Sequence, residues 1–267
     1  MKLVPGLRTL PAIVLVAASL AVAGCAKDTT TTGSVSKGSA TSLENMSASE
    51  LNGMVAAQGA KYQANPKDKA VGLSYASLLR MIGRDEQALA VMRQMVIFHP
   101  KDNEVLSAYG KALAATGNFV QALDAIERAQ RPDRPDWRLM SAKGAILDQL
   151  GKTDEAREMY RRALDIVPNE PSILSNLGMS YLLSNDLGAA ETYLRKANAQ
   201  AGADSRIRQN LALVVGLQGR FDEAEQIASA ELPAAEAQDN IQYLRKMLTQ
   251  QNAWSQLKAE DKKTKKQ

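Results

Sequence analysis

A spacing of 34 residues recurs along this chain without an insertion, and it constrains the fold more than any other feature of the sequence. The frame starts at Lys69, Asn103, Trp137, Pro171 and Ser205. The eighth residue of each copy is alanine or glycine, and the twentieth is always alanine. A fixed period of this length is typical of solenoids, in which single copies cannot bury their apolar faces and stacked copies form one continuous core.

Other positions of the frame suit pairs of helices joined by tight turns. The fifteenth residue is glycine in four copies and Asn185 in the other, and both residue types adopt the left-handed backbone conformation that ends a helix. Small residues at the eighth and twentieth positions are expected to lie on facing helices, where they let two backbones approach closely. Pro100 and Pro168, at the thirty-second position, cannot continue a helix and separate one repeat from the next.

Repeats two and four depart from this pattern, with Arg134 and Gly202 at the thirty-second position. Pro132 and Pro135 flank the first of these departures. We therefore expect an irregular junction with a local kink there, followed by a helix that Asp136 caps.

The repeats resemble the tetratricopeptide repeat. In the fourth copy the resemblance rests on Leu177-Gly178, Tyr181, Ala190 and Ala197, and over the five copies it covers about 170 residues. It implies an all-α fold, a right-handed tetratricopeptide-repeat superhelix of about five repeats with capping helices at both ends. It also implies that the first helices line a concave surface, which in this family binds extended or helical peptide segments.

The family's inward-facing positions give nine candidate residues for a partner-binding groove: Arg138, Ser141 and Gln149 in repeat three, Met179 and Leu183 in repeat four, and Arg206, Gln209, Leu213 and Leu217 in repeat five. Two interpretations of the apolar part remain open: it accepts an amphipathic helix, or Met179 and Leu213 fill space between repeats. Asn176 and Asn210 share one repeat position, but we do not interpret them as a carboxylate clamp, because the basic pattern of such a clamp is missing.

The repeats occupy residues 69–238, and residues 43–68 precede them as an N-terminal helical half-repeat. Its start is predicted by the capping-box pattern from Ser47 to Glu50, and its end by Asn65-Pro66.

Residues 239–257 are expected to form a C-terminal capping helix that closes the solenoid. Ile241, Leu244 and Leu248 lie on one helical stripe, with Tyr243, Met247 and Trp254 beside it. Residues 258–267 are rich in lysine and are expected to be disordered.

Residues 1–24 have the organisation of a lipoprotein signal peptide. The apolar run of about 14 residues is shorter than the roughly 20 that a membrane crossing needs. Ala23 and Gly24 precede the only cysteine, Cys25, and resemble the lipobox of bacterial lipoproteins. In that family the cysteine thiol is linked to diacylglycerol, so Cys25 is the expected lipid attachment site, and no cofactor is expected besides this covalent lipid.

Residues 25–42 are expected to form a flexible tether, because eleven of the seventeen residues after the cysteine are Thr, Ser or Gly. Lipoproteins retained at the inner membrane usually have aspartate after the cysteine, whereas Ala26 stands here. The expected location is therefore the outer membrane, with the repeats facing the periplasm.

Charge and reactive residues argue against several function classes. The net charge is +4, but the excess of basic residues lies in the first 24 and last ten residues, so the repeats offer no basic face for nucleic acid. One cysteine and one histidine exclude a disulfide framework and a clustered zinc site. No catalytic or phosphate-binding motif stands outside the repeats, so we expect neither enzymatic activity nor a bound metal nor a small-molecule substrate.

Three segments are similar to the TadD family, the tetratricopeptide lipoproteins of the tight-adherence (Flp) pilus assembly system. They are Pro-Asp-Trp-Arg at 135–138, the helical segment from Asp154, and Asn-Ile-Gln-Tyr-Leu-Arg from Asn240. The resemblance implies an accessory protein that binds pilus or secretion assembly proteins, such as an outer-membrane secretin. The alternatives are a pilotin or scaffold of another envelope machine, and a recruiter or regulator of a cell-wall enzyme.

Overall fold

The computed structural model describes residues 47–230 and 232–264, and within them the chain is helical, with one isolated β-bridge between Arg131 and Arg134 and no strand. The helices of this part are α2 (Ala48–Ala64), α3 (Lys69–Met81), α4 (Asp85–Phe98), α5 (Asn103–Ala115), α6 (Phe119–Ala129), α7 (Trp137–Gln149), α8 (Thr153–Ile166), α9 (Pro171–Leu183), α10 (Leu187–Asn198), α11 (Ser205–Leu217), α12 (Phe221–Ser229) and α13 (Ala234–Thr264). The expected signal peptide, Cys25 and the tether lie outside the described residues.

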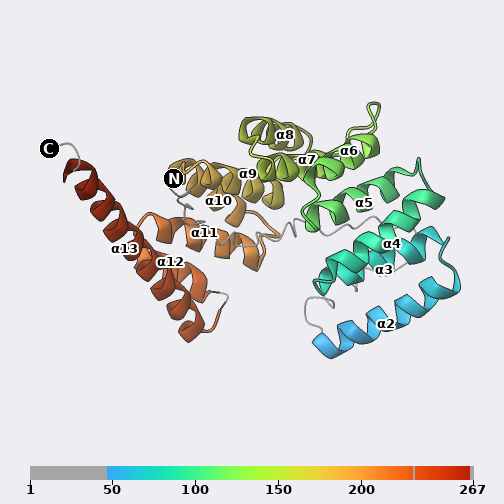
Figure 1. Ribbon diagram of the computed structural model, residues 1–267, viewed down its shortest axis with the longest axis horizontal. Helices are drawn as coiled ribbons and strands as arrows, with labels where there is room; N and C mark the ends of the chain where they lie inside the picture. The colour runs from blue at the N-terminus through green and yellow to red at the C-terminus, as the bar shows by residue number, and fades with distance from the viewer. Residues whose placement is uncertain (1–46, 231, 265–267) are drawn as a thin grey trace, which may run out of the picture.

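Helices α3 to α12 form five consecutive pairs that stack side by side (Figure 1). Each first helix packs against the second helix of its own pair, and each second helix packs against the first helix of the next pair. The backbones of neighbouring first helices also approach one another closely, whereas in the described chain those of neighbouring second helices do not. The first helices therefore form the inner layer of the curved stack. We call their accessible surface the inner face, and that of the second helices the outer face.

The helix pairs follow the 34-residue frame. The five first helices begin at the residues where the frame starts, namely Lys69, Asn103, Trp137, Pro171 and Ser205. All five residues at the fifteenth position have positive φ, from 61° at Asn185 to 83° at Gly219. The left-handed conformation expected at this position is thus present in every turn between paired helices.

Small residues bring the two helices of each pair together. The alanines at the twentieth position are all fully buried: Ala88, Ala122, Ala156, Ala190 and Ala224. A Cβ added at Gly178 would lie 2.9 Å from Leu194 Cγ and 3.1 Å from the backbone oxygen of Ala190. The eighth and twentieth positions therefore face each other, and a larger side chain at either would force the helices apart.

An acidic residue caps every first helix. The side chain immediately before each helix accepts a hydrogen bond from a backbone N–H of its first turn, in the series Asp68, Asp102, Asp136, Glu170 and Asp204. The cap at Asp136 confirms the sequence prediction. The other four were missed, although the same spacing of 34 residues marks them.

The junction before α7 is irregular, as its prolines predicted. The backbone N–H of Arg134 donates to the carbonyl of Arg131 at 3.2 Å, which closes a tight turn. Within this turn an ion pair joins Arg131 and Asp133 at 2.7 Å, so local contacts take the place of the usual proline.

Helix α2 is the expected half-repeat before the first pair. The Ser47 hydroxyl accepts from the backbone N–H of Glu50, and the Glu50 carboxylate accepts from the backbone N–H of Ser47, which confirms the capping box. The helix ends at Ala64, before Asn65-Pro66, and packs against α3. Val55 and Gly59 are its buried residues.

Helix α13 differs from the expected C-terminal cap. It begins at Ala234 rather than at 239 and continues to Thr264, through most of the lysine-rich segment expected to be disordered. Ala, Glu and Lys are strong helix formers, which explains why the helix does not stop at Leu257. Ile241 and Leu244 are buried as predicted. Figure 1 shows α13 running on past the end of the stack.

Among the described residues, no helix combines the length and the hydropathy that a bilayer crossing requires.

Candidate protein-binding surface

The nine candidate residues lie on α7, α9 and α11, three first helices that contact one another in sequence. The structure therefore places the candidates on adjacent helices of the inner layer. Their accessibility nevertheless differs, and this separates residues that can meet a partner from residues that hold the repeats together.

The candidates on α7 are polar and differ in role. The Arg138 guanidinium lies 4.5 Å from the centroid of the Trp137 ring, and Gln149 is exposed. Ser141 is only 7% exposed, and its hydroxyl accepts a hydrogen bond from Asn176 Nδ2 at 3.1 Å. Ser141 is therefore a contact between repeats three and four rather than an accessible groove residue.

The same contact recurs one repeat later. Asn210 Nδ2 donates to the buried Ser175 hydroxyl at 3.3 Å, with the same separation of 35 residues. Asn176 and Asn210 thus hold neighbouring first helices in register, which is a structural role.

Two polar candidates, Arg206 and Gln209, lie near the N-terminal end of α11. Gln209 is exposed, and its amide donates to the Ser205 hydroxyl at 3.1 Å. Arg206 is half-buried, with its guanidinium 3.6 Å from the Asp204 carboxylate.

The apolar candidates of α9 and α11 divide into two kinds. Met179 and Leu217 are half-buried, and Met179 packs against the buried cluster that contains Leu211 and Val214. Leu183 and Leu213 are 47% and 37% exposed. Met179 therefore does fill space between repeats, whereas Leu183 and Leu213 present apolar surface to solvent.

Helix α13 extends this apolar surface. It packs against α11 and takes the place of a sixth first helix, so Tyr243 and Met247 stand 34 residues after Gln209 and Leu213. Tyr243 is 67% exposed and Met247 is 46% exposed. From the sequence we expected these side chains to help close the solenoid and did not expect them to extend the inner face. Adding 34 to the numbers of Gln209 and Leu213 would have indicated the second role.

We call the combined surface the apolar strip, which consists of Met179, Leu183, Leu213, Leu217, Tyr243 and Met247 on α9, α11 and α13.

The Asp148 carboxylate of α7 joins repeats three and four. Asp148 of α7 accepts hydrogen bonds from the Ser180 hydroxyl at 2.8 Å and from the Tyr160 hydroxyl at 3.0 Å. Burial raises the pKa of Asp148, while the two hydrogen bonds and the nearby Arg157 act in the opposite direction. Burial also raises the pKa of Tyr160 well above its ordinary value. The cluster fixes α7, α8 and α9 relative to one another.

An ion-pair network links α10 and α12 on the outer face. Arg220 donates to both carboxylate oxygens of Glu191, at 2.7 and 2.8 Å, and Arg195 binds the same carboxylate. Arg195 and Arg220 also pair with Glu223. The hydrogen bond from Arg220 is the main cause that lowers the pKa of Glu191, to about 2. The backbones of these two second helices are not in close contact, and charged side chains join them instead.

Among the residues that the structure describes, no group of three or more His, Cys, Asp or Glu side chains could hold a metal ion.

Comparison with protein families gives two overlapping matches. One tetratricopeptide repeat model matches residues 108–171 and a second matches residues 147–214. The uncharacterized protein y4yS of Sinorhizobium fredii is 32% identical over 103 residues, which are 39% of this chain and 56% of that protein. The chain covers only part of its curated relatives: 25% of the length of the first and 56% of the length of the second.

Two solved structures are similar over most of the chain. A tetratricopeptide repeat protein from Parabacteroides merdae shares 13% identity, with a TM-score of 0.65 over 74% of this chain and 78% of that one. PilW, a widely conserved type IV pilus biogenesis factor, shares 18% identity, with a TM-score of 0.60 over 75% of this chain and 94% of that one. At these identities the likeness shows the fold. Together with the period and the helix pairs, the matches show that the chain contains tetratricopeptide repeats and that these repeats form an all-α superhelix.

Proposed function

We propose that the protein is a scaffold that binds a partner protein through the apolar strip. The observation that carries this proposal is the exposure of Leu183, Leu213, Tyr243 and Met247 on three neighbouring helices. Removing apolar surface from water contributes about 25 cal/mol per Å², so a partner that covers these side chains gains binding free energy. Neighbouring packed helices lie about 8 to 10 Å apart, a spacing that one amphipathic helix laid across them can bridge.

The proposed setting is the outer membrane, with the repeats in the periplasm and the chain anchored by a lipid on Cys25. The signal-peptide pattern and the lipobox-like residues before Cys25 support this setting. Several acyl chains on one cysteine would hold the protein on its membrane, because each buried methylene adds about 0.8 kcal/mol.

Within this setting we propose that the scaffold assists assembly of a tight-adherence (Flp) pilus or secretion apparatus, with its outer-membrane secretin as the partner. The similarity of three segments to the TadD family supports the pilus system. An alternative is the assembly of a type IV pilus, which the structural likeness to PilW favours.

Recovery of partners from intact cells tests the proposal. The membrane-anchored protein is crosslinked and purified, and the proteins recovered with it are identified by mass spectrometry. The inner-face variant combines Leu213→Glu with Met247→Glu, both at exposed positions. The matched control is Val120→Glu on α6, where the native side chain is 70% exposed on the outer face. Because burial of one large apolar side chain contributes about 1.5 to 3 kcal/mol, the inner-face variant should recover the partner at least about tenfold less well.

Recovery of the secretin with wild type and with Val120→Glu, but not with the inner-face variant, supports both the partner and its site. Equal recovery with all three proteins contradicts the apolar strip. Recovery of type IV pilus components in place of Flp components contradicts the Flp assignment and favours the alternative, and recovery of cell-wall enzymes contradicts both.

A further inference from the structure

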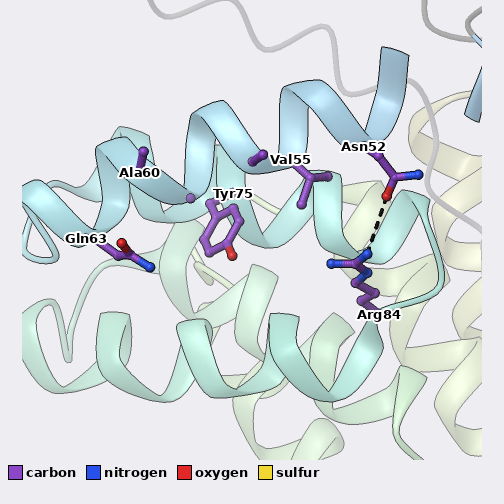
Figure 2. Close-up of a pocket in the computed structure, with 8 residues that line it drawn as sticks. Asn52, Val55, Ala60, Gln63, Tyr75 and Arg84 are labelled. Atoms are coloured by element: carbon purple, nitrogen blue, oxygen red, sulfur yellow. Dashed lines mark hydrogen bonds between the residues drawn. The ribbon is translucent and has the colours of Figure 1, made fainter. Parts of the chain in front are cut away.

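An open pocket of about 370 Å³ lies between α2 and the start of α4, away from the apolar strip (Figure 2). Its longest wall is the stretch of α2 from Asn52 to Gln63, with Tyr75 of α3 and Arg84 completing the lining. Figure 2 shows Tyr75 between the two helices, with Asn52 and Arg84 joined at one end. The volume is at the lower end of the range for sites that bind ligands.

The repeat frame explains why space is open here. At the positions of Gly59 and Ala60, the second helices of the next four repeats carry longer side chains: Arg93 and Gln94, Glu127 and Arg128, Arg161 and Arg162, and Arg195 and Lys196. In α10, Arg195 reaches across to Glu223 of α12. No side chain of comparable length extends from Gly59 or Ala60. The Tyr75 ring covers Gly59, and the space beside Ala56 and Ala60 stays open.

The frame also shows which chemical group would suit the pocket. Arg84 and Arg220 hold the same repeat position, and so do Val55 and Glu191. Arg220 binds the Glu191 carboxylate through two hydrogen bonds of 2.7 and 2.8 Å. At the N-terminal end of the solenoid, valine stands where that carboxylate would be. The arginine is repeated, but its anionic partner is not.

Arg84 has a weak polar contact in place of the ion pair. Its guanidinium donates to Asn52 Oδ1 at 3.4 Å, which is long for a hydrogen bond. In the described part of the chain no carboxylate forms an ion pair with Arg84. The pocket therefore presents one cation to solvent at one end, and a planar guanidinium binds a carboxylate well through two parallel hydrogen bonds.

The rest of the pocket is long and has short side chains. Gln63 lies eleven helical steps after Asn52, which corresponds to about 16 Å along a helix. Between them the wall consists of Val55, Ala56, Gly59 and Ala60. A trough of this length fits several consecutive residues of a peptide better than it fits a compact small molecule.

We propose that this pocket binds an acidic peptide segment of a partner protein. An Asp or Glu carboxylate of the segment pairs with Arg84 as Glu191 pairs with Arg220, and a small apolar side chain lies against Ala56 and Ala60. The site shares no residue with the apolar strip, so the proposal stands or falls independently of the function proposed above.

Peptide selection tests this inference. A phage-displayed library of random twelve-residue peptides is selected on the full chain in mild detergent, and the enriched sequences are synthesised for binding measurements. Arg84→Gln removes the cation at an exposed position, and Ala60→Gln places in the pocket the residue that α4 carries at this position. The matched control is Lys152→Gln, which removes one positive charge from the same repeat position of repeat three. Leu213→Glu on the apolar strip is a second control.

The proposal expects enriched peptides with an Asp or Glu near a small apolar residue. Binding should weaken at least tenfold with Arg84→Gln or Ala60→Gln in the protein, and also with Asp→Asn or Glu→Gln in the peptide. The controls Lys152→Gln and Leu213→Glu should bind the peptide as wild type does. The proposal is overturned if no acidic peptide is enriched, or if enriched peptides bind wild type and Arg84→Gln alike. Self-association of the protein that Arg84→Gln abolishes would identify a second copy of the chain as the occupant, and it would also overturn the proposal.

Discussion

Gly178 and Gly53 both lie inside helices, yet their surroundings place opposite demands on a side chain. A Cβ at Gly178 would lie 2.9 Å from Leu194 Cγ and 3.1 Å from the Ala190 carbonyl oxygen, whereas nothing lies within 4 Å of a Cβ at Gly53. The close packing of α9 on α10 therefore requires Gly178. Gly53 makes no such contact, and it only lowers the stability of α2 relative to alanine.

Alanine substitutions should therefore change stability in opposite directions. Overpacking costs about 1 to 3 kcal/mol, and glycine within a helix costs roughly 1 kcal/mol relative to alanine. Gly178→Ala should thus lower the free energy of unfolding by about 1 kcal/mol, and Gly53→Ala should raise it by roughly 0.5 to 1 kcal/mol. Urea unfolding followed by circular dichroism measures both. A stabilising Gly178→Ala would contradict the close-packing account.

Single residues also show the limit of prediction from the repeat frame. The frame correctly placed Ser141 and Leu213 on first helices, but it could not tell that an asparagine of the next repeat covers Ser141 while Leu213 stays exposed. Exposure depends on which side chains the neighbouring repeat supplies, and the family's positions alone do not contain that information. Cys25 lies outside the described residues, so its role stays a prediction.

At the scale of helices, α13 closes the core through one face only. A Cβ at Gly216 of α11 would lie 2.6 Å from Leu244 Cδ2, so α13 packs directly on the backbone of α11. Leu244 is buried, whereas Tyr243 next to it is exposed. One helix therefore serves both as a cap and as part of the inner face.

Replacing these two residues by alanine should separate the two roles. Leu244→Ala leaves a cavity against α11 and should lower the free energy of unfolding by about 2 to 4 kcal/mol. Tyr243→Ala should change it by no more than about 0.5 kcal/mol, because the side chain is exposed. Hydrogen exchange of the α11 amides, together with urea unfolding, measures the difference. Similar losses for both variants would contradict this orientation of α13.

The ion-pair network between α10 and α12 should make stability depend on pH. The pKa of Glu191 is lowered from 4.5 to about 2 in the folded protein. The network therefore stabilises the fold above about pH 4.5, and its contribution is lost as the pH falls toward 2. Glu191→Gln should cost roughly 1 kcal/mol or less at pH 7, because the arginines are partly exposed, and the difference from wild type should shrink as the pH falls.

Chemical unfolding of wild type and Glu191→Gln at a series of pH values between 7 and 2 measures this loss. Glu155→Gln is a control in which the ion pair, with Lys152, is largely exposed. A difference between wild type and Glu191→Gln that stays constant across this range would show that the carboxylate is not held by Arg220 and Arg195.

Helix boundaries were predictable where the period continued and not where it ended. Turn residues and caps recur every 34 residues, so all five first helices begin where the frame starts. Beyond the fifth pair no further copy fixes the boundary, and the helix propensity of Ala, Glu and Lys carries α13 from Ala234 to Thr264.

At the scale of the whole molecule, the stack of repeats offers two separate surfaces, the apolar strip on α9, α11 and α13 and the pocket beside α2. In a solenoid each repeat contacts only its neighbours, so changes at one end are not expected to unfold the other. The two surfaces should therefore respond independently to mutation. The period predicted the inner face, but the pocket depends on the absence of long side chains at Gly59 and Ala60, which only comparison between the copies shows.

Membrane attachment is a property of the whole chain that one residue should control. If Cys25 carries the lipid, Cys25→Ser should move the protein from the membrane fraction to the soluble fraction, because the acyl chains supply the attachment. Cell fractionation with mass spectrometry of the mature N-terminus checks this. Retention of Cys25→Ser in the membrane fraction would point to another means of attachment.

Site-specific photocrosslinking in intact cells tests the central claim, partner binding through the apolar strip, most directly. A photoreactive amino acid is placed at Leu213, or at Val120 on the outer face, and the crosslinked products are identified by mass spectrometry. The account predicts a discrete partner crosslinked from Leu213 and not from Val120, and loss of this product when Met247→Glu is added. A product from Val120 with none from Leu213 would contradict the account.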